Sequence, residues 1–296
     1  MSSFSRYARA SRLGCVPTKS RMAEGSGPSS PLSKAQCVMA PRSIDSRPSI
    51  PQWSHVIVAG LLLVITLSPV AHARSPVENA KDTPSTVRLP NFSIDQTEVS
   101  IAQFQAYVRA TGTVTRAESE GGGYEFLAGW ERIAGTNWRQ PNRVGETNPH
   151  WPAVHLTHAE AQGYCQWAGG RLPTHAEWLS AAFTEQRETP PPPFVLGRTY
   201  PWPTGNSPRG ANTSEADPWP RAAPVGATRA GVNGLFDMGA NVWEWTDTAQ
   251  GDTRQTVGGS WWYPSYQMQA SVQAFKPKDF YAVYIGFRCV YPHADR

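Results

Sequence analysis

The stretch from Gly231 to Asp247, G-V-N-G-L-F-D-M-G-A-N-V-W-E-W-T-D, constrains the fold more than any other part of the chain. It places two carboxylates, Asp237 and Glu244, seven residues apart, with small residues and one asparagine between them. That spacing is too irregular for one helix face, and the stretch has too many turn residues for a plain strand. Small residues permit a tight turn, so main-chain carbonyls can converge with the carboxylates. Ca²⁺ takes such mixed oxygen ligands; the alternative is an ordinary turn with two solvated acids packed under two tryptophans.

The N-terminal part of the chain has the pattern of a secretory leader. Residues 56–67 are almost continuously apolar, with Arg42 and Arg47 before them and A-H-A at residues 71–73 after them. A basic region, a short apolar run and an A-x-A site are typical of a signal peptide, and a membrane span needs about 20 apolar residues. We therefore expect residues 1–73 to be a leader that is cleaved after Ala73, with an uncleaved anchor as the alternative. Residues 1–38 show no periodicity, so Met39 is a second candidate for the start.

The charge of the chain changes once the leader is removed. The whole chain has a formal net charge of +4, but the 223 residues after Ala73 contain 19 basic and 21 acidic side chains. No basic stripe remains, which argues against a nucleic-acid partner. We expect no stable membrane span after cleavage, and a periplasmic location.

Two cysteines remain after the leader, because Cys15 and Cys37 lie within it. The remaining pair, Cys165 and Cys289, indicates one disulfide in an exported chain, with two buried free thiols as the alternative. A disulfide that closes so long a loop stabilises by roughly 4–5 kcal/mol on the chain-entropy model.

Capping boxes predict three helices, which begin after Ser100, Thr157 and Thr174. Strands are expected at residues 92–99, 256–262 and 282–290, and residues 113–152 are expected to be irregular. Residues 74–87 read as a flexible lead-in, residues 88–291 as one domain and residues 292–296 as a tail. Few regular elements, many turns and eleven tryptophans after the leader predict an α+β domain dominated by loops.

The central stretch resembles the signature of the formylglycine-generating enzyme family, also called sulfatase-modifying factors. Three further strings agree in order: W-A-G-G-R-L-P-T-H-A-E-W at residues 167–178, G-G-S-W-W at 258–262 and G-F-R-C at 286–289. F-S-I-D-Q-T-E-V-S-I-A-Q-F at residues 92–104 resembles the opening strand and helix of the family. The resemblance covers about residues 88–291 and implies a C-type-lectin-like fold with little regular structure, braced by calcium and by a disulfide between the two remaining cysteines.

The resemblance also implies two structural calcium sites that combine side-chain and main-chain oxygens. Their residues would be Asp237, Ala240, Val242 and Glu244 at one site, and Asn212, Thr213, Asp217 and Trp219 at the other.

Catalytic members of the family bind copper through two cysteines that follow the G-G-S string. This chain has Tyr263 and Met268 at those positions. Thiolates are the soft ligands that Cu(I) prefers, and neither a phenol nor a single thioether replaces them. We therefore expect no copper at this site and no formylglycine formation.

An aromatic, sulfur-bearing patch stands where the copper site would be, and we expect it to line a substrate cleft for a planar group. The alternative is that its tryptophans belong to the core. The expected cleft residues are Trp243, Trp261, Trp262, Tyr263, Tyr266, Gln267 and Met268. The candidates for a catalytic group are Tyr263, Glu118, Glu120 and Ser260.

His150, His155 and His158 lie close in sequence, but their spacing matches no tight metal-ligand pattern. We expect surface or capping roles for them.

Exported relatives without the cysteine pair resemble this chain most. They include the PvdO type, which matures pyoverdine, and the NirV type, an accessory of nitrite reductase. One hypothesis is a maturation enzyme that oxidises an aromatic or peptidic substrate such as a siderophore chromophore. The other is a non-enzymatic accessory protein for a periplasmic metalloenzyme such as copper nitrite reductase. A sugar-binding lectin would follow from the fold alone.

Overall fold

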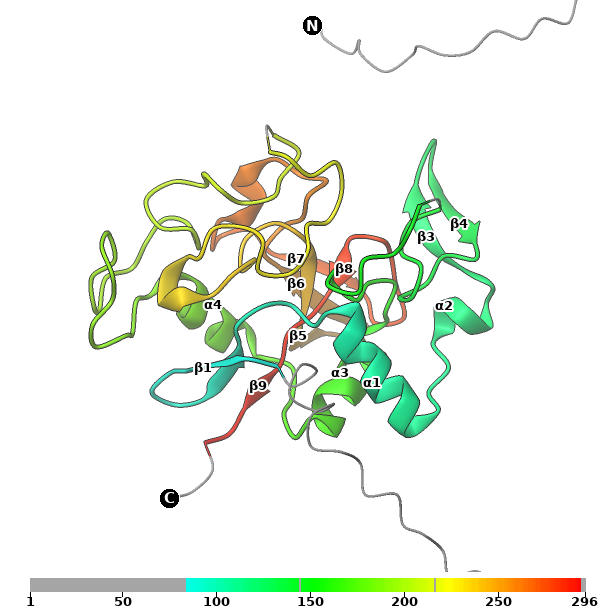
Figure 1. Ribbon diagram of the computed structural model, residues 1–296, viewed down its shortest axis with the longest axis horizontal. Coiled ribbons are helices and arrows are strands. Elements are labelled where there is room, and N and C mark those ends of the chain that lie inside the picture. The colour runs from blue at the N-terminus through cyan, green and yellow to red at the C-terminus, as the bar shows by residue number, and fades with distance from the viewer. Residues whose placement is uncertain (1–83, 144, 216, 294–296) are drawn as a thin grey trace, which may run out of the picture. The chain divides into compact units, whose positions relative to one another are not determined.

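The computed structural model describes residues 84–143, 145–215 and 217–293 (Figure 1). The expected leader, the candidate start at Met39, and most of the lead-in and the tail lie outside these residues. The described chain combines helices with three small sheets, so the predicted α+β content is confirmed.

The three predicted helices are present with their capping boxes. They are α1 (Ile101–Thr111), α3 (His158–Trp167) and α4 (His175–Phe183). Gly112 ends α1 with a φ of 71°, a left-handed conformation that glycine adopts without a steric penalty. No helix in the described part of the chain is long and apolar enough to cross a bilayer.

The stretch expected to be irregular, residues 113–152, contains a helix and two strands. A fourth capping box, Thr115 with Glu118, begins the short helix α2 (Arg116–Ser119). A hairpin of β3 (Gly122–Phe126) and β4 (Trp130–Ala134) follows it. The prediction of an irregular segment was therefore wrong for residues 116–134.

The remaining strands form two sheets. β2 (Ser93–Asp95) lies between β1 (Thr86–Arg88) and β9 (Val290–Tyr291). The second sheet has the order β7-β6-β5-β8, with only the β5–β8 pair parallel. Its strands are β5 (Trp243–Gln250), β6 (Thr253–Val257), β7 (Ala274–Pro277) and β8 (Ile285–Gly286).

The predicted strands were too long, and the backbone shows why in one case. β6 ends at Val257 because Gly258 and Gly259 have φ values of 93° and 79°, which interrupt an extended chain. Two short 3₁₀ turns, η1 (Val232–Gly234) and η2 (Ser265–Met268), flank this region of the sequence.

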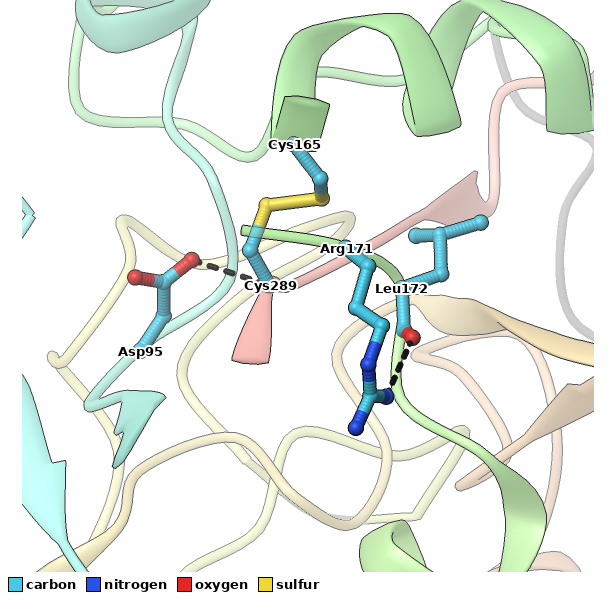
Figure 2. Close-up of a disulfide and its surroundings, with 5 residues drawn as sticks. All are labelled: Asp95, Cys165, Arg171, Leu172 and Cys289. Atoms are coloured by element: carbon cyan, nitrogen blue, oxygen red, sulfur yellow. Dashed lines mark hydrogen bonds between the residues drawn. A yellow bond between two sulfur atoms is a disulfide. The ribbon is translucent and has the colours of Figure 1, made fainter. Parts of the chain in front are cut away.

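The core joins α1 and α3 to the sheet that contains β5. Phe104 of α1 stacks on Tyr164 of α3 with ring centroids 5.8 Å apart, and both rings contact Phe287. Cys165 of α3 is bonded to Cys289, which lies next to β9, so the predicted disulfide is confirmed. Figure 2 shows this bond beside Asp95, whose carboxylate accepts a hydrogen bond of 2.8 Å from the Cys289 amide. The disulfide therefore links α3 to the segment that precedes β9.

Candidate functional site

The turn between Asp237 and Glu244 folds as tightly as its sequence predicts. Asp237, Ala240 and Asn241 have φ values of 57°, 66° and 52°. Aspartate and asparagine tolerate this left-handed conformation better than other non-glycine residues. Asn241 is fully buried, and its side-chain oxygen accepts hydrogen bonds from the Ala223 amide and the Asn212 side chain. Asn241 therefore links the turn to the preceding loops that contain Asn212 and Ala223.

A buried ion pair lies at the end of this turn. Arg288 of the G-F-R-C string and Glu244 are 0% and 1% exposed, and the guanidinium donates to both carboxylate oxygens at 2.7–3.0 Å. Trp178 donates its indole N–H to the same carboxylate at 2.8 Å. Arg288 also donates to the carbonyls of Asp95 and Phe236. A buried carboxylate with these partners is neutralised inside the protein.

Glu98 and Asp237 complete the group, which we call the buried polar centre: Glu98, Asp237, Asn241, Glu244 and Arg288. Glu98 accepts hydrogen bonds from the Val242 amide and the Asn241 side chain. Burial, and then the charges of Asp237 and Glu244, raise the pKa of Glu98 well above its usual value. Burial also raises the pKa of Asp237, whose oxygens accept from the Gly226 amide and Thr228.

The first expected calcium set does not fit this arrangement. One of its two carboxylates, Glu244, accepts hydrogen bonds from the buried Arg288 guanidinium on both of its oxygens. A divalent cation and Arg288 would compete for that carboxylate. This arrangement therefore does not support a calcium ion held by Asp237, Ala240, Val242 and Glu244.

The second expected set fits better. The Asn212 side-chain oxygen is buried and has no hydrogen-bond partner among the described residues, which leaves it available to a cation. The Asp217 carboxylate lies in the same loop, where it accepts from the amides of Thr213 and Trp219. Calcium would be held here by Asn212 and Asp217 with main-chain carbonyls. In the described part of the chain, no three His, Cys, Asp or Glu side chains are grouped so that they could hold a metal.

Two cavities open beside this loop, each of about 460 Å³, and they share Trp219 and Pro220. We call them together the tryptophan cleft, because four half-buried indoles form their walls. One cavity is lined by Thr213, Ser214, Glu215, Asp217, Pro218, Trp219, Pro220, Trp261 and Trp262. The other is lined by Asn142, Arg143, Trp151, Trp219, Pro220, Arg221 and Ala222. The volume of each suits a small organic ligand.

The structure divides the expected cleft residues into two groups. Trp261 and Trp262 line the cleft. Trp243 and Tyr263 instead pack edge to face, and Tyr263 contacts Tyr284 in the same way, so these rings belong largely to the core. Met268 is buried in a cluster with Ala211 and Ala240, and Trp202 packs against this cluster.

Tyr266 is exposed, and the Gln267 amide donates to the Pro264 carbonyl within η2. Neither residue lines the two cavities described above. Of the seven residues expected to line the cleft, Trp261 and Trp262 therefore line these two cavities, and the other five do not.

The expected catalytic carboxylates are engaged in structural contacts. Glu118 caps α2 and accepts from Trp138 and Arg139. Glu120 pairs with Arg116 and Arg132, and a hydrogen bond from Arg116, then one from Tyr281, lowers the pKa of Glu120 to about 2.

Ser260 is buried, and its hydroxyl accepts from the Trp262 amide. None of these three side chains lines the two cavities, and a carboxylate with so low a pKa is a weak base near neutral pH.

The histidines do not converge. His155 and His158 each bond a backbone carbonyl through Nε2, of Pro141 and Thr246 respectively, and His150 is exposed. Burial lowers the pKa of His155 to about 4, so it is neutral in the folded protein.

Two arginines that no sequence pattern predicts line the cleft, Arg143 and Arg221. Arg143 and Arg221 both approach the buried Glu125 carboxylate, at 3.6 and 3.4 Å. Arg221 also lies over the Trp261 ring, 5.5 Å from its centroid. Each arginine ends a short proline-containing string in a loop, P-N-R at residues 141–143 and P-R at residues 220–221. Neither string has a pattern that predicts a site.

Comparisons with known proteins agree with this fold. Residues 55–292 match the model of the sulfatase-modifying factor enzyme 1-like domain. The formylglycine-generating enzyme of Thermomonospora curvata is 30% identical over 260 residues, which cover 69% of this chain and 83% of that protein. The mouse protein named inactive C-alpha-formylglycine-generating enzyme 2 is 27% identical over 242 residues, which cover 69% and 76%.

Among solved structures, that of PvdO from Pseudomonas aeruginosa is similar in fold. It has a TM-score of 0.51 and 21% identity, and the match covers 68% of this chain and 80% of that one. The extent of the domain match, together with the Thermomonospora relative, identifies the family: the chain belongs to the formylglycine-generating enzyme family of sulfatase-modifying factors.

Proposed function

We propose that this protein is an exported maturation factor that acts on an aromatic or peptidic substrate in the tryptophan cleft and does not form formylglycine itself. A siderophore chromophore is an example of such a substrate. Export rests on the signal-peptide pattern of residues 1–73.

The cysteines support the negative part of the proposal. Cys165 and Cys289 are the cysteines of the described residues, and both are buried in one disulfide. Tyr263 and Met268 stand where the resemblance places the copper ligands, and neither is a thiol. Copper chemistry of the family's kind needs soft thiolate ligands. We therefore assign no copper to this chain.

The wall of the cleft is the observation that carries the positive part. Trp151, Trp219, Trp261 and Trp262 line two adjoining cavities, and no lining residue is a cysteine. Half-buried indoles at a cavity wall offer flat apolar surfaces on which a planar group can stack. Trp261 and Trp262 lie 4.9 Å apart between ring centroids with an interplanar angle of 48°, so they present two adjoining faces.

The second candidate is a non-enzymatic accessory protein for a periplasmic metalloenzyme such as copper nitrite reductase. The engaged carboxylates favour it, since Glu118 and Glu120 are held by arginines away from the cavities. The mouse relative named as inactive also supports a role without catalysis. In this case the cleft would hold a peptide segment of the partner.

One experiment separates the two candidates. The purified protein is incubated with peptides that contain tryptophan, tyrosine or dihydroxyphenylalanine, and mass spectrometry and an oxygen electrode follow the mixture. Conversion that is lost in Trp261→Ala but kept in Trp167→Ala, an exposed indole of α3, supports the enzyme. Binding without conversion supports the accessory protein, and an absence of both contradicts the proposed cleft.

We also propose a structural calcium ion at Asn212 and Asp217. Calcium that binds only the folded state raises its stability by mass action, and a 100-fold excess over Kd gives about 2.7 kcal/mol. Thermal unfolding should therefore shift upward when calcium replaces a chelator, and the shift should vanish in Asp217→Asn. Equal melting temperatures with calcium and with chelator would rule this ion out.

A further inference from the structure

The cavity on the arginine side of the cleft combines flat apolar walls with positive charge. Trp151 and Trp219 supply the walls, and Arg143 and Arg221 supply two guanidinium groups. The arginine side chains are 44% and 35% exposed, so each is partly accessible at the cavity. An indole wall selects planar groups, and a guanidinium fork selects anions.

The charges at this cavity do not balance. Both arginines approach the same oxygen of Glu125, which is buried on β3. One carboxylate neutralises one guanidinium, so the pair of arginines retains one positive charge in excess. Glu215 lines the adjoining cavity, and its negative charge favours the arginine side for a ligand anion.

Arg221 is fixed before any ligand arrives. It donates to Asn142 at 3.1 Å and to Glu125 at 3.4 Å, and its guanidinium lies over the Trp261 ring. Its carbonyl accepts from the Asn212 side chain, which holds the backbone in place. A group that is already oriented loses little conformational entropy when it binds.

Donors remain available on these arginines. Within the described residues, two of the five guanidinium N–H groups of Arg221 have a hydrogen-bond partner, and Arg143 has only its ion pair of 3.6 Å. Parallel N–H groups of a guanidinium match the two oxygens of a carboxylate.

We propose that this cavity binds a planar aromatic group that carries a carboxylate, with the ring on Trp219 and Trp151 and the carboxylate on Arg221 and Arg143. The inference rests on the proposed function, since it assigns a ligand class to the same cleft. The single excess charge fits a monoanion.

The test compares two probes that differ in one charge. N-acetyl-L-tryptophan has an indole and a carboxylate, and N-acetyl-L-tryptophanamide has the same indole with a neutral amide. Isothermal titration calorimetry with the purified protein should show the acid binding about tenfold tighter than the amide, as expected for hydrogen bonds to a charged group. Added salt should weaken the binding of the acid and leave the binding of the amide nearly unchanged.

Substitutions test whether the two arginines cause the preference for the acid. Arg143→Gln and Arg221→Gln should each reduce the preference for the acid several-fold, whereas Glu125→Gln should increase it, because it releases both guanidiniums. Arg139→Gln is the matched control, since Arg139 also stacks on a tryptophan and pairs with a glutamate but does not line the cavity. Arg143 is exposed, so its variant keeps the Arg221–Glu125 pair and should fold even if Arg221→Gln does not.

The outcomes distinguish this inference from the proposed function. Equal binding of the two probes, or a preference that survives the Arg143→Gln and Arg221→Gln double variant, overturns the carboxylate assignment and leaves an aromatic cleft. Binding of neither probe overturns the assignment as well. A preference for the acid without conversion of any aromatic substrate supports this inference and contradicts the enzymatic function.

Discussion

The buried polar centre and the tryptophan cleft use the same residue types in opposite ways. In the centre, Arg288 is fully buried and donates to Glu244 and two carbonyls, while the Trp178 N–H is also bound to Glu244. In the cleft, Arg221 is 35% exposed, and three of its five guanidinium N–H groups have no hydrogen-bond partner among the described residues. Polar groups that are fully satisfied inside the protein brace the fold, whereas groups left partly unsatisfied at a cavity remain available to a ligand.

Asn241 joins the two regions. Its side chain binds Glu98 of the centre, and its carbonyl accepts a hydrogen bond of 2.8 Å from the Trp261 amide of the cleft. The centre therefore positions the cleft wall, and the two regions should respond differently to substitution. Changes in the bracing should lower stability, and changes in the cleft should lower binding.

The largest effect on stability should come from the disulfide. Replacing both cysteines by alanine, Cys165→Ala with Cys289→Ala, should lower the free energy of unfolding by about 4–5 kcal/mol, since the bond closes a loop with a sequence separation of 124. Urea denaturation measures this value. Reductant should destabilise the wild type and leave the double variant unchanged. A double variant as stable as the wild type would mean that the disulfide is not part of the bracing.

A similar loss of stability should follow when the buried polar centre loses the guanidinium of Arg288. Arg288→Met should lower the free energy of unfolding by about 3–5 kcal/mol, because it leaves the buried Glu244 carboxylate without its partner. Adding Glu244→Gln should recover part of the loss. Arg171→Met is the matched control, since its ion pair with Glu177 is exposed and should be worth about 1 kcal/mol or less. Equal effects of the two single variants would contradict the bracing role.

The third effect is a dependence on pH. Burial lowers the pKa of His155 to about 4 from an ordinary 6.5, so the unfolded chain takes up a proton in this range before the folded protein does. Stability from this residue is therefore present above pH 6.5 and is lost as the pH falls toward 4. Between pH 6.5 and 5 the wild type should lose about 2 kcal/mol more than His155→Asn, in which asparagine tolerates the φ of 58°.

Urea denaturation at several pH values checks this difference. Burial raises the pKa of Asp95 to about 7, which acts in the opposite direction over the same range, so the comparison must be between variant and wild type. The exposed His150→Asn provides the control. Parallel curves for wild type and His155→Asn would show that folding does not lower the pKa of His155.

The smallest effect on stability, with a large effect on binding, should come from the cleft. Trp219→Ala should change the free energy of unfolding by about 1 kcal/mol or less, because the indole is only half buried. The same variant should weaken the binding of N-acetyl-L-tryptophan at least tenfold, because a stacking surface is lost. Calorimetry and urea denaturation on the same preparation measure both. Trp167→Ala should leave binding unchanged. A Trp219 variant that unfolds but binds normally when folded would reverse the comparison between the two regions.

Local patterns explain which parts of this structure could be predicted. The capping boxes at Ser100, Thr157 and Thr174 lie within four residues of sequence, so they fix helix starts without tertiary information. The β3–β4 hairpin could not be predicted because G-G-G-Y-E lacks the alternating pattern of a strand. In the folded protein β3 contacts α2.

The site depends on pairs that are distant in sequence. Glu244 finds Arg288 across 44 residues, and Glu125 finds Arg221 across 96. No local spacing encodes such contacts. The prediction that Glu244 binds calcium therefore could not include the Arg288 guanidinium, which donates to that carboxylate. Glu120 stands out as a candidate base in the sequence, but Arg132 and Tyr281 engage it only after folding.

We propose that the domain is braced by its disulfide and its buried polar centre and lacks the thiol ligands that copper chemistry needs. The most direct measurement incubates the purified protein with Cu(I), oxygen and a cysteine-containing sulfatase peptide and looks for the aldehyde by mass spectrometry, with a known formylglycine-generating enzyme as the positive control. We predict that the cysteine peptide remains unchanged while the positive control converts it. Aldehyde formed by this protein would contradict the account.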